Sequence, residues 1–238
     1  MVEPSHPRSL GAIGLNDAVV LVLSDRDLGV AFSATEAGSV TPTKANLLAH
    51  ERVLERLLAE SDAVLPFSFG TLTEGEDAIR DLLRTAEEEF KENISRLRGC
   101  IEVGLKVFWQ KDAMRREVEQ MTGSISDIGN RATSAEARQT SAIQVGQAVE
   151  QVLRQWREHF VPMITATLEP VCKDWKENGS FGATMLWNGS FLVRREHEPL
   201  FFDRLSGLDQ RFGNRLDFRH VAPLPPYNFV DLRYGDGG

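Results

Sequence analysis

The residues whose types could support acid–base chemistry are His50 and Glu51, which are adjacent in a segment with helical periodicity, residues 42–58. An imidazole and a carboxylate can exchange a proton when they are held in reach of a common substrate. Adjacent helical residues diverge by about 100°, and the sequence shows no third group to orient the pair. The alternative interpretation is structural: both border a buried stripe and hydrogen-bond to neighbouring backbone.

No other segment carries a recognised pattern for a metal, a phosphate or a nucleophile. The five histidines have no HxxxH or HExxH spacing, and the sequence contains no GxxxxGK[ST] loop. Glu196, His197 and Glu198 could bind a metal, but such a segment is more typical of a solvated turn. We therefore expect a non-enzymatic protein with no catalytic residue, no metal site and no cofactor.

Composition narrows the class of protein further. A chain of 238 residues with 42% hydrophobic content can bury one large core or two smaller ones. The net charge of −8 argues against a nucleic-acid groove and favours a neutral or basic partner surface. Cys100 and Cys172 fit no CxxC spacing, so we expect reduced thiols. The N-terminus does not resemble a secretory signal and no apolar run approaches 20 residues, which predicts a cytoplasmic protein without a membrane span.

A helix and a strand should position His50 and the residues that follow it. Thr41 and Pro42 favour a helix start, and the apolar stripe of this helix is Leu47, Leu54, Leu57 and Leu58. In residues 64–71 large apolar residues alternate with small ones, which predicts a strand. Its apolar face carries Leu65, Phe67 and Phe69, and its small face carries Pro66, Ser68 and Gly70. A helix, a loop or another protein could pack closely on the small face.

The order of elements predicts an α+β fold for a first domain, residues 1–110. We expect a hairpin within residues 19–32, a helix that starts at Thr73 and continues to residue 97, and a strand over residues 101–109. Glu102 and Lys106 share the face of that strand that is opposite the core face. Strands and helices in this order suggest a variant of the ferredoxin-like sheet with two helices.

The second domain, residues 111–238, should also be α+β. A connection rich in Gly, Ser and Asn, residues 122–134, precedes two helices that Pro162 separates and that we expect to form an antiparallel hairpin. A small sheet follows, with a strand or hairpin at residues 183–193, a helix at 199–212 and a strand at 215–221. The proline-rich tail, residues 223–232, is apolar and is expected to dock on the body.

Several blocks of the sequence, taken in order, resemble the gas vesicle protein F/L (GvpF/GvpL) family. The similarity extends over roughly residues 19–232. The blocks are residues 46–53, 64–67, 69–71, 101–107, 191–193 and 225–230, together with Gly99 and Met185. Two departures are that Ser68 stands where the family often has Arg, and that the chain opens with a polar, proline-containing segment in place of a full strand.

The resemblance implies an accessory protein of gas vesicle assembly with a two-domain α+β fold and no catalytic residues or cofactor. Its partners would be a small, very hydrophobic shell protein and other accessory proteins. On this basis we expect partner binding at Phe67, Phe69, Gly70, Glu102 and Lys106. The competing hypothesis is a ferredoxin-like sensor of a small ligand, or an unrecognised enzyme that uses His50 and Glu51.

Overall fold

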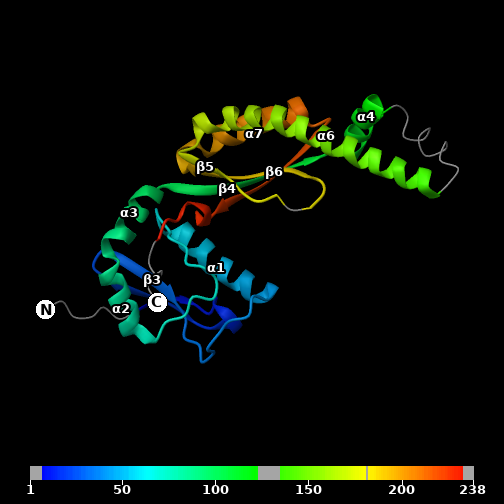
Figure 1. The fold of residues 1–238 in the computed structure, drawn as a ribbon. Coiled ribbons are helices and arrows are strands. Elements are labelled where there is room, and N and C mark those ends of the chain that lie inside the picture. Colours follow the sequence, from blue (N-terminus) through cyan, green and yellow to red (C-terminus); the bar gives the residue numbers. More distant parts are fainter. Residues whose placement is uncertain (1–6, 123–134, 181, 233–238) are drawn as a thin grey trace. The chain divides into compact units, whose positions relative to one another are not determined.

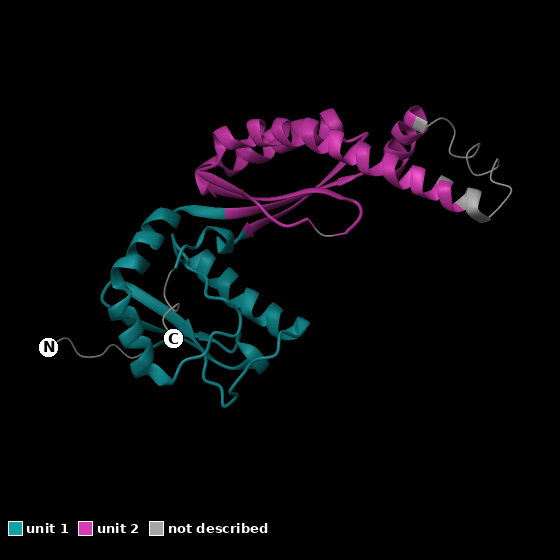
Figure 2. Ribbon diagram, in the orientation of Figure 1, with its two compact units in different colours: residues 1–101, 224–238 teal, residues 102–223 magenta. Residues whose placement is uncertain are grey.

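The computed structural model describes residues 7–122, 135–180 and 182–232, so most of the Gly-, Ser- and Asn-rich connection at 122–134 lies outside the described residues. The chain divides into two units (Figure 2): one consists of Met1–Ile101 and Leu224–Gly238, and the other is Glu102–Pro223. These ranges differ from the expected ones, because most of the strand after residue 100 counts with the second unit and the tail with the first. No helix among the described residues is long and apolar enough to span a membrane.

The first unit contains a three-stranded antiparallel sheet in the order β1-β2-β3. Its strands are β1 (Arg8–Gly11), β2 (Val20–Asp25) and β3 (Leu28–Phe32). The expected hairpin is confirmed, with Asp25 opposite Leu28 across a two-residue turn. The N-terminal segment does supply a strand, although β1 has only four residues.

Three helices complete the first unit: α1 (Lys44–Glu60), α2 (Gly75–Thr85) and α3 (Glu87–Leu97). The expected single helix from Thr73 is interrupted at Ala86, which has non-helical torsion angles. Its apolar stripe nevertheless forms the core of the unit with the hairpin. The buried members of this core are Leu23, Leu28, Ile79, Leu83, Ala86 and Phe90.

Two expectations for the segment around His50 are wrong. Helix α1 starts after Thr43, whose hydroxyl accepts a hydrogen bond from the Asn46 backbone N–H, and Leu47 on it is 39% exposed; the residues that α1 buries are Ala49, Leu54 and Leu58. Residues 64–71 form no strand. Pro66 offers no N–H to a ladder, and Gly70 turns the chain with a φ of +85°. The ferredoxin-like arrangement expected in this part of the chain is therefore not found.

That arrangement is found instead in the second unit, in a four-stranded sheet of order β5-β6-β4-β7. The elements follow as β4 (Cys100–Trp109), α4 (Lys111–Thr122), α6 (Ala135–Leu168), β5 (Asp174–Glu177), β6 (Met185–Arg194), α7 (Glu198–Phe212) and β7 (Leu216–Leu224). With α4 and α6 taken as one helical layer, this is the β-α-β-β-α-β order of a split β-α-β fold. The Trp109 N–H donates to the Thr184 carbonyl, so the end of β4 lies beside the start of β6, and the two strands run antiparallel.

Helices α6 and α7 cover one face of this sheet (Figure 1). The core face of β4 alternates as expected, and Ile101, Val103, Leu105 and Val107 are all fully buried. Helix α6 contributes Phe160, Ile164 and Leu168 to the same layer, and α7 contributes Phe201, Leu205 and Leu208. Glu102 and Lys106 lie on the opposite face of β4, which α6 and α7 do not cover.

One further expectation for the second unit is wrong. The helical hairpin is absent, because α6 continues through Pro162 and the residues expected in a second helix form β5 around Trp175. Of the two alternatives for residues 183–193, a strand or a hairpin, the strand is confirmed as β6, and the Asn188-Gly189 pair lies inside it. Gly189 is required there for space, because a Cβ atom would lie 2.2 Å from the indole of Trp187.

The C-terminal tail packs against α3 within the first unit. Phe229 is completely buried, and the side chain of Asn93 bonds both backbone groups of Asp231: its amide donates to the carbonyl at 2.9 Å and its oxygen accepts from the N–H at 3.0 Å. The guanidinium of Arg96 also donates to the Phe229 carbonyl. The C-terminal tail thus completes the packing of the first unit, although it follows α3 by more than 120 residues.

Replacing Phe229 by Ala should destabilise the first unit by about 3 to 5 kcal/mol, because it removes a fully buried ring and leaves a cavity. Val19 is 50% exposed, and Val19→Ala in the same unit should change stability by no more than about 0.5 kcal/mol. Hydrogen exchange of the α2 and α3 amides in increasing urea measures both effects. Equal effects of the two variants would show that the tail contributes no core contact.

Candidate functional site

Phe67, Phe69 and Gly70, which we expected at a partner surface, lie between α1 and α2 in the first unit. Phe67 packs against the hydrophobic core, with its ring centroid 6.1 Å from that of Phe90 in an edge-to-face arrangement. Phe69 is half-buried, and Gly70 is exposed at a turn. Phe67 is thus mainly a core residue, whereas Phe69 and Gly70 lie nearer the surface.

His50 is held among aromatic rings. The centroid of its imidazole ring lies 5.7 Å from that of the Phe69 ring, in an edge-to-face arrangement, and 6.4 Å from that of the Tyr227 ring in the tail. Its Nε2 atom is buried and has no hydrogen-bond partner. Burial lowers the pKa of His50 below its usual value, although the backbone of Phe67 and the charge of Glu51 act in the opposite direction. Burial therefore favours the neutral form of the imidazole.

Glu51 faces a different environment from that of His50. It lies in a shallow hollow on the exposed side of α1, with Ala45, Leu48, Arg52 and Glu55. Partial burial, together with the Glu51 carboxylate, raises the pKa of Tyr227 to about 12. His50 does not line the hollow that contains Glu51, so the acid–base pair of the competing hypothesis does not meet there.

Cys172 offers little nucleophilic character. Burial and the nearby carboxylates of Glu169 and Asp174 raise the pKa of its thiol to about 11, so the reactive thiolate is scarce at neutral pH. Within residues 7–122, 135–180 and 182–232, no three His, Cys, Asp or Glu side chains gather in a way that could hold a metal ion.

Glu102 and Lys106, the other two expected partner residues, lie on β4 in the second unit. Both belong to the strand face that α6 and α7 do not cover, as the alternation predicted. Glu102 is only 2% exposed, whereas Lys106 is exposed. The lysine is thus the member of this pair that a partner can reach.

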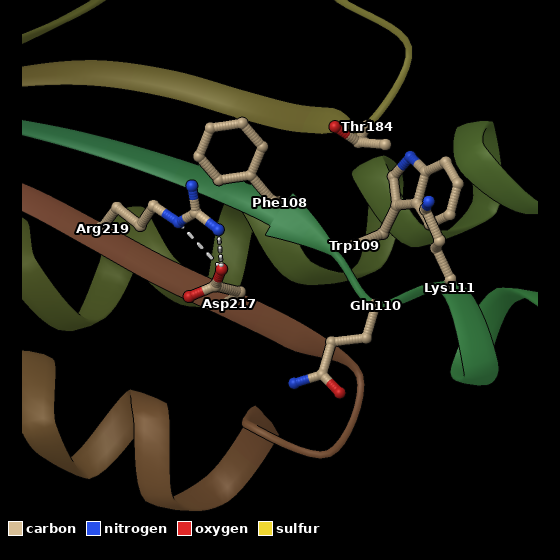
Figure 3. A pocket seen from close by; sticks show the side chains of 7 residues that line it. All are labelled: Phe108, Trp109, Gln110, Lys111, Thr184, Asp217 and Arg219. Atoms are coloured by element: carbon tan, nitrogen blue, oxygen red, sulfur yellow. Dashed lines mark hydrogen bonds and ion pairs between the residues drawn. The ribbon is translucent and has the colours of Figure 1, made fainter.

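An open hollow of about 340 Å³ lies on the same sheet face, at the C-terminal end of β4 (Figure 3). We call it the Phe108 hollow; it is lined by Phe108, Trp109, Gln110, Lys111, Thr184, Asp217 and Arg219. The guanidinium carbon of Arg219 lies 4.7 Å from the centroid of the Phe108 ring, within the range of a cation–π contact. Asp217 accepts a hydrogen bond from Arg219 Nε at 2.9 Å and forms an ion pair with a terminal guanidinium nitrogen at 2.7 Å, and so orients the guanidinium.

The sequence pointed to Lys106 as a partner-binding residue, which stays a prediction, and it did not indicate the Phe108 hollow. Phe108 shares the strand face of Glu102 and Lys106, and its residue type alone indicates no role there. Asp217 and Arg219 were recognised only as part of a strand, although residues two apart on a strand share a face. Their placement beside Phe108 depends on the pairing of β7 with β4, which links residues more than 100 positions apart.

The fold resembles that of two solved structures. The structure is similar to GvpF from Anabaena sp. PCC7120, with a TM-score of 0.76, 24% identity, and coverage of 95% of this chain and 93% of the other. It is also similar to GvpF from Microcystis aeruginosa, with a TM-score of 0.74, 22% identity, and coverage of 94% and 93%. These likenesses define the fold class as the mixed α/β fold of GvpF proteins.

The family follows from the sequence match. The family model described as gas vesicle synthesis protein GvpL/GvpF matches residues 1–231. Gas vesicle protein F of Dolichospermum flosaquae is 29% identical, over 80% of this chain and 78% of that protein, and the Streptomyces sp. (strain CB03234) protein of the same name is 28% identical, over 96% and 95%. The chain belongs to the GvpL/GvpF family of gas vesicle synthesis proteins, which confirms the resemblance seen in the sequence.

The buried imidazole of His50 should make the stability of the first unit depend on pH. Its pKa is lowered in the folded state, so below about pH 6.5 the unfolded chain binds a proton that the folded chain resists. The free energy of unfolding should therefore be highest above pH 6.5 and decrease as the pH falls toward the lowered pKa. This slope can be measured by urea unfolding at several pH values between 7.5 and 5.5, with hydrogen exchange of the α1 amides as the probe.

The His50→Gln variant should have a smaller slope over this range, whereas His197→Gln, at an exposed position, should keep that of the natural protein. Carboxylates titrate mostly at lower pH and contribute little here. A slope that His50→Gln leaves unchanged would contradict the burial of a neutral imidazole.

Proposed function

We propose that this protein is a non-catalytic accessory factor of gas vesicle assembly in the cytoplasm, and that it binds the hydrophobic shell protein and other accessory proteins. The observation that carries the proposal is the match of the GvpL/GvpF family model to residues 1–231. Relatives named gas vesicle protein F that align over most of their length add support.

A physical need accounts for such a factor. A small, very hydrophobic shell subunit exposes apolar surface before it is incorporated, and exposed apolar surface promotes aggregation. A folded protein with a net charge of −8 stays soluble and can cover that surface transiently. Binding would be reversible, because the shell subunit must be released to the growing vesicle.

We propose Phe67, Phe69 and Gly70 in the first unit, and Glu102 and Lys106 in the second, as the partner-binding residues. Their exposure ranks them: Gly70 and Lys106 can contact a partner directly, and Phe69 can contribute the accessible part of its ring. Phe67 and Glu102 would act from below the surface by holding the turn and the strand in place.

A sensor of a small ligand that uses His50 is the second candidate, and the buried Nε2 atom without a partner favours it. Such a ligand would supply a hydrogen bond to Nε2 and stabilise the protein in proportion to the logarithm of its concentration. A thermal-shift screen of metabolites against the natural protein and His50→Gln would identify it by a shift that only the natural protein shows.

Deleting the gene for this chain from a gas vesicle gene cluster should abolish or strongly reduce vesicles seen by electron microscopy, and the intact gene should restore them. Complementation with Lys106→Glu should restore fewer vesicles, because reversing an exposed charge weakens a partner contact. Lys44→Glu reverses an exposed charge on α1 and should restore vesicles fully.

Equal amounts of soluble protein in each strain, measured by immunoblot, would exclude loss of folding as the cause. Normal vesicles in the deletion strain would overturn the proposed function. Full rescue by Lys106→Glu would overturn only the assignment of that residue.

A further inference from the structure

We propose that the Phe108 hollow, together with Lys106, binds an acidic, extended segment of a partner protein. The proposal rests on the proposed function, since an assembly factor must recognise other proteins, and it names the chemistry that one of its surfaces selects. Three features of the second unit carry it: local charge, a stacked platform and a sheet edge.

The local charge is opposite in sign to that of the chain. Lys106, Lys111 and Arg219 carry three positive charges against the one negative charge of Asp217, which leaves +2 on a protein with a net charge of −8. Among the described residues, neither Lys106 nor Lys111 makes an ion pair, whereas Arg219 is paired with Asp217. Two ammonium groups are thus available to carboxylates brought by a partner.

The stacked platform gives this charge a defined geometry. Figure 3 shows Phe108 on β4 and Arg219 on β7 side by side, with Asp217 joined to the guanidinium. The Trp109 indole N–H donates to the Ala183 carbonyl at 3.0 Å, which fixes that ring at the rim. Fixed aromatic and guanidinium groups lose little conformational entropy on binding and offer apolar contact between the lysines.

The sheet edge accounts for an extended partner. Strand β7 is the last strand of the sheet order β5-β6-β4-β7, and Val221 on it is 60% exposed. An added strand can hydrogen-bond along such an edge, and every second side chain of that strand then points to the sheet face that carries the hollow, beside Arg219 on β7. Pro223 has no N–H, so pairing is expected along the earlier residues of β7.

A protein segment fits better than a nucleic acid. A polyanion meets repulsion from a chain of net charge −8, and nucleic-acid surfaces combine many phosphate contacts, whereas the hollow offers only a few cations beside a carboxylate. An acidic strand with aliphatic residues between its carboxylates complements both the lysines and the apolar rings.

The test uses the full chain and two labelled ten-residue peptides, one alternating Glu with Val and the other alternating Lys with Val. Fluorescence anisotropy should show binding of the Glu-Val peptide that weakens as salt is raised, and at least tenfold weaker binding of the Lys-Val peptide. The double variant Lys106→Glu/Lys111→Glu should weaken Glu-Val binding at least tenfold. Lys44→Glu, at an exposed position on α1, should leave it unchanged.

Failure of the Glu-Val peptide to bind, or binding that the double variant retains, would overturn the proposal. Competition by a single-stranded oligonucleotide of equal charge at the same concentration would overturn the choice of a protein partner. Circular dichroism of the double variant, compared with that of the natural protein, would show that both are folded. Vesicle formation in the deletion strain is measured separately, so either result leaves the proposed function to its own test.

Discussion

Strand β4 buries four aliphatic side chains completely on one face, and the second unit is built on that face. Within that unit, Val103, Leu105 and Val107 lie on the face that α6 and α7 cover, and burying each such side chain contributes about 1.5 to 3 kcal/mol. A shift of one residue in register would exchange this face for Glu102, Gly104 and Lys106, so the pairing of β4 with its neighbours is strongly specified. Since α6 and α7 cover one face, the other face of β4 carries Glu102 and Lys106 and, at the end of the strand, the open Phe108 hollow.

The parts of the fold that could be predicted are those that local periodicity determines. The alternation in residues 101–109 predicted β4, the two apolar runs before residue 33 predicted the hairpin, and the apolar stripe after Thr73 predicted the helical segment that becomes α2 and α3. In each case the pattern distinguishes buried from exposed side chains within a single helix or strand. The interruption at Ala86 was not predictable in this way, because the stripe continues on both sides of it.

The errors have a common physical origin, in that tertiary contacts outweighed local signals. Pro162 should end a helix, yet Phe160 and Ile164 on either side of it are buried beside the sheet, and their burial outweighs one lost backbone hydrogen bond. Asn188-Gly189 is typical of a turn and so left a hairpin open beside a strand; the strand forms, and Gly189 allows the close approach of the Trp187 indole. The Phe108 hollow required pairing between β4 and β7, and the position of the tail on α3 required contacts across more than 130 residues. Periodicity carries no information on such distant pairs.

The charge of the chain illustrates why a site must be argued from its own geometry. A net charge of −8 predicted a neutral or basic partner, which is a statement about long-range repulsion and solubility. Contacts are decided within about a Debye length, roughly 8 to 10 Å at moderate salt, and at that range the groups that matter are the two lysines and the oriented Arg219. The net negative charge of the chain would repel an acidic segment at long range, and the cations at the hollow would attract it once it is close. Such a surface favours short-range complementarity over long-range steering, and it would discriminate against bulk polyanions while it accepts a matched carboxylate ladder.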